Sequence, residues 1–141
     1  MTTESDPIDE IHRSFILFSR SARTRANDMY EGLSFVAYSL LTYVDINECP
    51  PASDLAEEYG LDKSTVSRQL AELETGGLLQ RVSDPDHSRK LRLELTDEGS
   101  SVLFIARAGQ RERLKQQLNS WSQDDVSTFG EPFWRFVSEL G

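Results

Sequence analysis

Cysteine and histidine are scarce in this chain: of 141 residues, one is cysteine (Cys49) and two are histidine (His12 and His87). A single cysteine excludes an internal disulfide and is typical of a reducing compartment, so we expect a cytoplasmic protein. The segment Asp84–His87 has one histidine beside carboxylates, which are too few good ligands for a metal site. We therefore expect no metal and no cofactor. No phosphate-binding glycine loop or nucleophile–base pairing is present, which argues against an enzyme.

Long hydrophobic runs are absent as well. No segment approaches the ~20 apolar residues that span a bilayer, so we expect no contact with a membrane. Residues 1–7 are polar and acidic, the reverse of a secretory signal. The hydrophobic fraction of 38% and the charged fraction of 28% are typical of a globular protein. The length fits one compact domain, or one small domain with helical extensions.

Positive charge is in short supply overall, and the net charge of −9 taken alone opposes nucleic-acid binding. Its distribution is uneven: residues 63–92 hold six basic and four acidic side chains, against four and twelve in residues 1–62 and five and eight in residues 93–141. Because DNA responds to the local field of the presented face, the segment 63–92 is the candidate DNA contact. The acidic flanks either lower non-specific affinity or serve solubility alone.

Helical patterns make up most of the chain. Apolar residues recur at spacings of three, four and seven from Ile8 to Met29, a stripe longer than one small core requires. Residues 33–44 are apolar nearly all round and predict a buried helix that ends before Pro50 and Pro51. Two short helices are predicted over 52–59 and 63–74, separated by Gly60, with Asp62 as the cap of the second.

A hairpin and two further helices complete the pattern. The runs 78–82 and 91–95 predict two strands, joined by a polar loop over 83–90. A helix is expected from Thr96 to about Leu118, and a last helix from Ser122 to near Leu140. The fold class predicted is therefore mainly α with a small antiparallel β-hairpin, in the order of a winged helix-turn-helix.

In this plan the second short helix enters the DNA major groove. The packing residues Leu55, Ala56, Leu61, Val66 and Leu70 are expected to fix the angle between the two helices. The outer face of helix 63–74 then carries Ser64, Thr65, Ser67, Arg68 and Glu72. Arg68 can pair with a guanine or grip a phosphate, and the hydroxyls can read bases or bind the backbone. A helix pair with a glycine turn is common in helical domains, and the basic hairpin favours DNA binding.

The segment Asp54–Leu79 resembles the MarR family of bacterial transcriptional regulators. The run Ser64–Arg68 and the closing Leu95-Thr-Asp-Glu-Gly99 are the most specific marks, and the resemblance extends over the whole chain. It implies that the first and last helices of two subunits interdigitate. Residues 1–32 and 97–141 would then form a helical dimerisation region, and residues 33–96 a winged helix-turn-helix DNA-binding domain.

The resemblance also implies roles for single residues. It implies that DNA is contacted by Ser64, Thr65, Ser67, Arg68 and Arg89. Arg89 would be a wing-tip arginine that inserts into the minor groove. The basic neighbours Lys63 and Lys90 complete the predicted DNA-binding set. The implied protein is a homodimeric regulator that binds a pseudo-palindromic double-stranded operator. It would be a repressor released by a small anionic or aromatic ligand, with Tyr30, Phe35 and Tyr38 as candidate pocket residues.

Two features depart from the family pattern. The family's wing usually reads Asp-Arg-Arg or Asp-Lys-Arg, where this chain has His87-Ser-Arg89. The acidic partner of the wing arginine is thereby replaced, and Asp84 or Asp86 is a candidate substitute. In addition, the segment Gly130–Pro132 predicts a kink or break in the last helix.

Two other functions are compatible with the sequence. The acidic surface suits a winged-helix module that binds a basic protein, for example an anti-repressor, although Arg68 and Arg89 on the DNA face oppose it. Alternatively, a DNA-binding redox sensor would use Cys49. The neighbouring Asp45 and Glu48 disfavour the thiolate and hence this reading.

Overall fold

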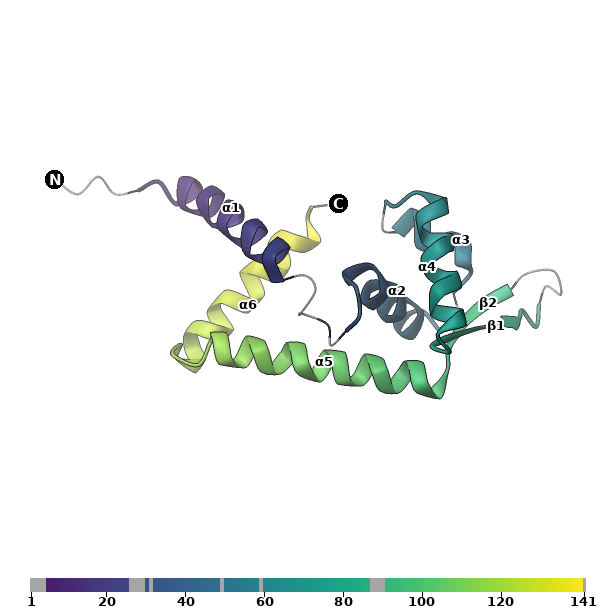
Figure 1. Cartoon of the computed structure of the whole chain (residues 1–141). Coiled ribbons are helices and arrows are strands. Elements are labelled where there is room, and N and C mark those ends of the chain that lie inside the picture. The colour runs from purple at the N-terminus through teal and green to yellow at the C-terminus, as the bar shows by residue number, and fades with distance from the viewer. Residues whose placement is uncertain are drawn as a thin grey trace.

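The computed structural model describes residues 5–25, 30, 32–48, 50–58, 60–86 and 91–140, with residues 52 and 53 described by their backbone alone. Within these residues the chain forms six helices and one two-stranded antiparallel sheet (Figure 1). In chain order they are α1 (Pro7–Arg25), α2 (Phe35–Ile46), α3 (Ala52–Glu58), α4 (Lys63–Thr75), β1 (Leu79–Ser83), β2 (Leu91–Leu95), α5 (Asp97–Gln117) and α6 (Gln123–Ser138).

The hydrophobic core lies at one end of the molecule, where α2 contacts α4, β2 and the first part of α5. Its fully buried side chains come from five different elements: Leu40, Leu41, Leu55, Leu70, Leu93 and Leu103. Full burial of a leucine side chain contributes about 2 kcal/mol, so these residues are the main stabilisers of the α2–α5 arrangement. The helix predicted over 33–44 is therefore buried as expected, although its ends, Phe35 and Ile46, are exposed.

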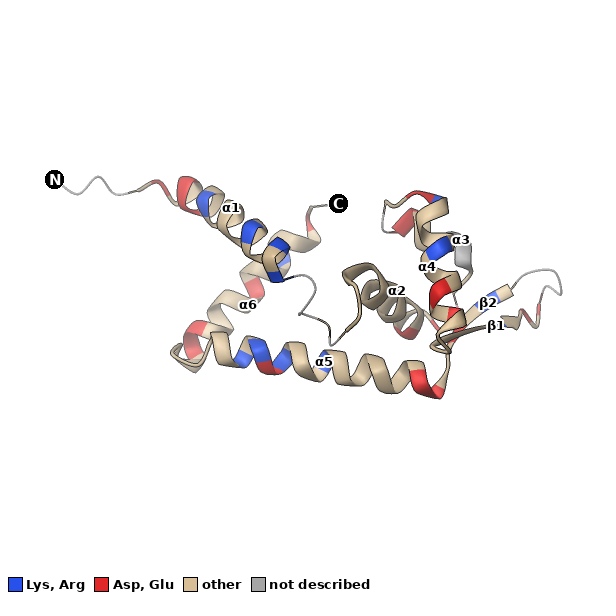
Figure 2. Ribbon diagram, viewed as in Figure 1, with Lys and Arg blue, Asp and Glu red and all other residues tan. Residues whose placement is uncertain are grey.

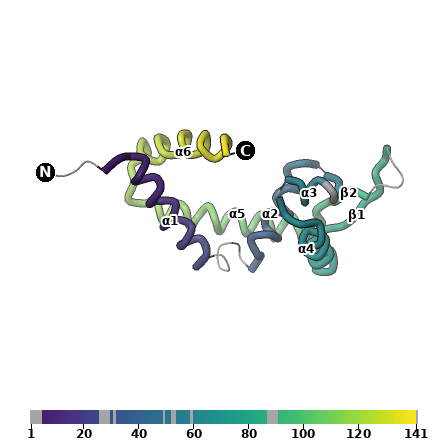
Figure 3. Tube along the Cα trace, turned by 90° about the horizontal axis from the view of Figure 1, so that it is seen from above, coloured from purple at the N-terminus to yellow at the C-terminus, as the bar shows by residue number. Residues whose placement is uncertain are grey.

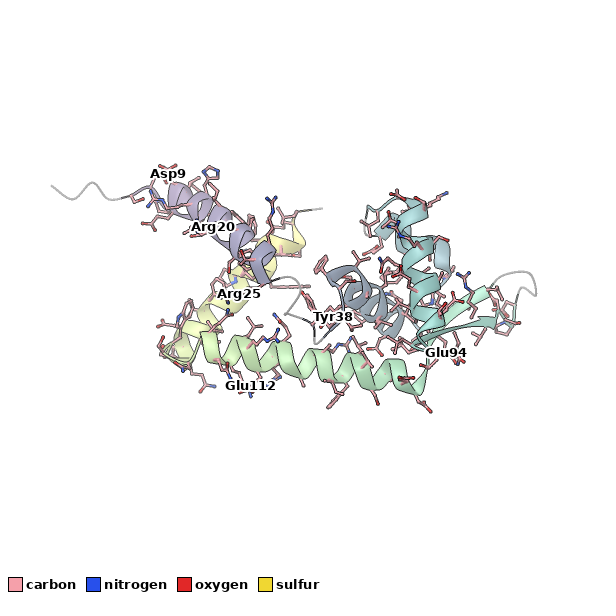
Figure 4. All side chains as sticks on the ribbon, in the orientation of Figure 1. Asp9, Arg20, Arg25, Tyr38, Glu94 and Glu112 are labelled. Carbon is pink, nitrogen blue, oxygen red and sulfur yellow. The ribbon has the colours of Figure 1, made fainter. Side chains whose placement is uncertain are left out.

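The other end of the molecule has no comparable core. Figure 3 shows α1 and α6 at one end of α5, with the α2–α4 unit and the hairpin at the other end. In Figure 4, Glu94 of the hairpin and Glu112 of α5 mark these two parts. Helices α1 and α6 contain no buried residue. They meet through Phe15 and Phe136, whose ring centroids lie 5.3 Å apart.

Helix starts follow the capping residues of the sequence. Ser34, Asp62, Thr96 and Ser122 are N-caps, and each side chain accepts a hydrogen bond from the backbone N–H three residues later. The predicted elements agree with the observed ones to within about two residues wherever the chain is described. The predicted stripe continues to Met29, and its last residues, 26–29, lie outside the described residues.

The prediction of a break at Gly130–Pro132 is wrong, because α6 is one helix over Gln123–Ser138 with Pro132 inside it. A proline removes one backbone donor, which leaves the carbonyl of Thr128 without its helical partner. That carbonyl belongs to an exposed helix, so solvent can reach it. Phe129 and Phe133 stack across the same turn with centroids 5.2 Å apart, a contact that supports the helix on both sides of the proline.

Candidate nucleic-acid interface

The turn between α3 and α4 holds the two helices at a fixed angle. Gly60 has a φ of +58°, a left-handed conformation that costs little only for glycine. The backbone N–H of Leu61 donates to the carbonyl of Ala56 at 3.2 Å and closes the turn. Leu55, Ala56 and Val66 are buried on the inner side. The core residues predicted for the helix-turn-helix therefore do pack beneath it, with Leu61 partly buried at its edge.

Most of the predicted DNA-binding residues lie on the opposite face of α4. Lys63, Ser64, Ser67 and Arg68 are exposed, and Thr65 is half-buried. Val66, Leu70 and Leu73 of the same helix point into the core and fix its orientation. The structure therefore brings five of the seven predicted residues together on one rigid helix. The other two, Arg89 and Lys90, lie outside the described residues, as does His87.

Asp62 organises the first turn of α4. Its Oδ1 accepts hydrogen bonds from the backbone N–H of Thr65 at 2.7 Å and from the hydroxyl of Ser64 at 2.5 Å. Its Oδ2 accepts from the hydroxyl of Thr65 at 2.8 Å. These bonds, that from Ser64 above all, lower the pKa of Asp62 to about 2. Sequence reasoning identified Asp62 as a cap and did not foresee that it engages two of the predicted DNA-binding hydroxyls.

Negative charge surrounds this face. The α3 carboxylates of Asp54, Glu57 and Glu58 are exposed, as is Glu72 of α4. Figure 2 shows acidic residues but no basic ones on α3, and both kinds along α4. Burial and then the charges of Asp54 and Glu58 raise the pKa of Tyr43, which places this tyrosine within the field of α3. A phosphate backbone approaching α3 would meet repulsion, so attraction has to come from α4 and the hairpin.

The hairpin has the register Leu79↔Leu95 to Ser83↔Leu91, with an ion pair at its outer end. Arg92 Nε donates to Asp84 Oδ2 at 2.9 Å, and Asp84 is only 5% exposed. Asp84 Oδ1 also accepts from the backbone N–H of Asp86 at 2.9 Å. Asp84, a candidate partner for Arg89, is thus already bonded to Arg92. In the sequence, only the opposite charges eight residues apart indicate this pair.

The base of the hairpin is locked to α5. The hydroxyl of Thr96 donates to the carbonyl of Gly77 at 2.6 Å and accepts from the backbone N–H of Gly99 at 3.0 Å. A Cβ atom on Gly99 would lie 2.0 Å from the carbonyl oxygen of Leu78, so only glycine fits. These contacts explain why the motif Leu95-Thr-Asp-Glu-Gly99 has threonine and glycine at positions 96 and 99.

An aromatic cluster joins Tyr30 to the first turns of α2. The ring centroids of Tyr30 and Tyr38 are 4.3 Å apart, and those of Tyr30 and Phe35 6.0 Å. Burial, and secondarily Tyr38, raises the pKa of Tyr30. Among the described residues, the buried oxygens Thr42 Oγ1 and Gln110 Oε1 have no hydrogen-bond partner. Nearby on the same two helices, Arg107 donates to Asp45 at 2.8 Å.

In the described part of the chain, no group of three or more His, Cys, Asp or Glu side chains is placed to hold a metal ion. None of the described helices combines the length and apolar character that a bilayer span requires.

Comparison with known proteins places this arrangement among bacterial regulators. Residues 31–90 match the profile of the MarR family. The chain is 34% identical over 130 residues to YxaD, an uncharacterized HTH-type transcriptional regulator of Bacillus subtilis (strain 168). That similarity covers 89% of this chain and 90% of YxaD.

Two solved structures show the same fold. A MarR family protein from Bacillus stearothermophilus superposes with a TM-score of 0.82 over 94% of each chain, at 17% identity. The PcaV transcriptional regulator from Streptomyces coelicolor, in complex with its natural ligand, gives a TM-score of 0.67 at 22% identity, over 100% of this chain and 98% of PcaV. The predicted winged helix-turn-helix fold is therefore confirmed.

Proposed function

This chain belongs to the MarR family of DNA-binding transcriptional regulators, a family of non-enzymes, and on that premise we propose that it is a homodimeric repressor released from its operator by a small molecule. The main support for this proposal is the arrangement of α4. This helix has Ser64, Ser67 and Arg68 on an exposed face above a buried core. A major groove is wide enough to admit such a helix.

Contact with DNA is assigned to α4 and the hairpin. Arg68 pairs with a guanine edge or a phosphate, and Lys63 at the helix start lies where a phosphate contact is expected. Arg89 and Lys90 at the hairpin tip reach the flanking minor groove, whose negative potential favours arginine. Two such units related by a twofold axis read half-sites about one helical turn (~10 bp) apart, hence a pseudo-palindrome.

Dimerisation is assigned to residues 1–32 and 97–141. Large apolar side chains are exposed throughout this region: Ile8, Ile11, Phe15, Ile16, Leu17, Phe18, Phe104, Ile105, Leu114, Trp121, Phe129, Phe133, Trp134, Phe136, Val137 and Leu140. A monomer rarely leaves so much contiguous apolar surface in water. A second copy of the same helices would bury it by symmetric packing.

Release by a ligand is assigned to the cluster between α2 and α5. Tyr30, Phe35 and Tyr38 offer aromatic rings at the start of α2. The unpartnered oxygens of Thr42, farther along α2, and of Gln110 on α5 offer polar groups. Arg107 supplies a cation close by, which suits a small anionic or aromatic molecule. PcaV, which shares this fold, was solved in complex with its natural ligand, and this supports ligand binding by the present chain. Binding there would alter the angle between α2 and α5, and with it the half-site spacing.

The test is selection of binding sites from a random duplex library, followed by footprinting and sedimentation of the complex. The proposal predicts twofold-symmetric sites, twofold footprints and two chains per site. A stable monomer, or sites without symmetry, would contradict it. Failure to enrich any sequence would instead favour the acidic surface of α3 as a protein-binding face, and with it the anti-repressor function.

A further inference from the structure

The hydrogen bonds of Asp62 have a defined direction. At neutral pH its carboxylate carries no proton and can only accept hydrogen bonds. Ser64 and Thr65 each have one hydroxyl proton, and both hydroxyls lie within bonding distance of Asp62, at 2.5 and 2.8 Å. Both protons must therefore point at Asp62. What the two hydroxyls present outward is lone pairs only.

This restricts what Ser64 and Thr65 can contact on DNA. A hydroxyl whose proton is engaged can accept from an amino group, such as N6 of adenine or N4 of cytosine. It cannot donate to O6 of guanine, O4 of thymine or a phosphate oxygen without breaking a bond to a charged carboxylate, and such bonds are among the stronger ones.

We propose that Asp62 is a positioning residue that sets base preference, by making the hydroxyls of Ser64 and Thr65 acceptors that select adenine or cytosine on the strand they face. The inference rests on the proposed function, in which α4 lies in the major groove. Asp62 itself touches no base in this scheme and acts through the two hydroxyls.

The charge of Asp62 favours the same outcome. Its carboxylate is exposed at the start of α4, where it repels phosphate oxygens. Backbone contact at this end of the helix is left to Lys63, which is exposed and next in the chain. Ser64 and Thr65 are then directed to base edges rather than to the backbone.

A single substitution reverses the direction of one bond while retaining the cap. In Asp62→Asn the backbone N–H of Thr65 requires the amide oxygen at the Oδ1 position, because only an acceptor can cap the helix. The amide nitrogen then faces the Thr65 hydroxyl and donates to it. The hydroxyl proton of Thr65 is released and can point outward. Asparagine caps helices as well as aspartate does, so the fold is retained.

The experiment is selection from a random duplex library with the wild-type chain, Asp62→Asn, Thr65→Val and the double variant, each sequenced to give base preferences. The wild type is expected to favour adenine or cytosine at one position per half-site. In Asp62→Asn that preference moves toward guanine or thymine, by about 3- to 10-fold in relative affinity, as expected for one hydrogen bond. Thr65→Val lowers the preference, and Asp62→Asn has no further effect on that position in the Thr65→Val background.

Asp54→Asn is the charge-matched control, because Asp54 is exposed on α3 and lies outside the hydroxyl network. It should raise affinity for all DNA sequences and leave base preference unchanged. The inference is overturned if Asp62→Asn selects the same bases as the wild type, or if Asp54→Asn shifts preference in the same way. Enrichment of no sequence by the wild type would overturn the proposed function itself, and this inference with it.

Discussion

Asp62 is exposed, yet its titration differs from that of an ordinary surface carboxylate. Hydrogen bonds from Ser64 and Thr65 stabilise the charged form and lower its pKa from 3.8 to about 2. Because the pKa is lower in the folded state, the stabilisation is fully present above the unfolded value and is lost as the pH falls through about 2. The cap residue Asp62 is therefore charged at every pH at which the protein would bind DNA.

Carboxyl titration by NMR tests this account of Asp62. We expect a midpoint near 2 for the wild type, and a higher one for Ser64→Ala combined with Thr65→Val, since both hydroxyl donors are then lost. A wild-type midpoint at the ordinary value of 3.8 would contradict the network.

Gly99 is the second residue whose identity is fixed by geometry. In Gly99→Ala the new methyl group meets the backbone carbonyl of Leu78 at 2.0 Å, and neither backbone can easily move. We expect a loss of about 3 kcal/mol in the free energy of unfolding, measured by urea denaturation. The neighbouring exposed Ser100→Ala should change it by less than about 0.5 kcal/mol. Equal stabilities for the two variants would show that α5 does not pack against Leu78 as described.

At the level of the elements, the hairpin contains an ion pair whose carboxylate, that of Asp84, is buried. Arg92→Leu leaves the carboxylate of Asp84 buried without its charged partner, which we expect to lower unfolding free energy by about 2 kcal/mol. Adding Asp84→Asn should recover much of that loss, since the buried negative charge is then removed.

Arg81 of the neighbouring strand provides the matched control for this pair. It pairs with Glu74 at 2.6 Å, but both side chains are about a third exposed, 35% and 30%. Arg81→Leu should therefore cost less than about 1 kcal/mol. If Arg81→Leu were as damaging as Arg92→Leu, burial of Asp84 would not be the cause.

The types and boundaries of the helices and strands were predictable because they depend on residues close together in the sequence. The caps Asp62 and Ser122 and the period-two run 91–95 each act within a few residues. The long-range pairs were not predictable in this way. The bond from Thr96 to Gly77 joins residues 19 apart, and Asp84 meets Arg92 only because the hairpin brings them together.

At Pro132 the local sequence was misleading, because a break was predicted where α6 continues through the proline. Proline disfavours a helix interior, but its cost falls where solvent can reach the freed carbonyl and where aromatic side chains stack across the turn. Similarly, the acceptor-only state of Ser64 and Thr65 follows from distances that no sequence pattern contains.

For the whole molecule, the uneven burial of apolar side chains is the main physical argument for a dimer. Trp134→Asp places a charge on a side-chain position that is 71% exposed in the single chain. We expect this variant to sediment as a monomer and to lose operator affinity, because burying an unpaired charge at an interface is costly. Ile46→Asp is the control, since Ile46 is similarly exposed (67%) but lies on α2. A Trp134→Asp variant that remains dimeric would place the interface elsewhere.

The most direct test of the central claim, that α4 and the hairpin read operator DNA, is a fluorescence-anisotropy titration of a selected site at two salt concentrations. The wild type should bind it far more tightly than unrelated DNA, with an affinity that falls steeply as salt increases. Arg68→Ala and Arg89→Ala should each weaken specific binding by about 5-fold or more. Equal affinity for selected and unrelated DNA, or no effect of either substitution, would contradict the claim.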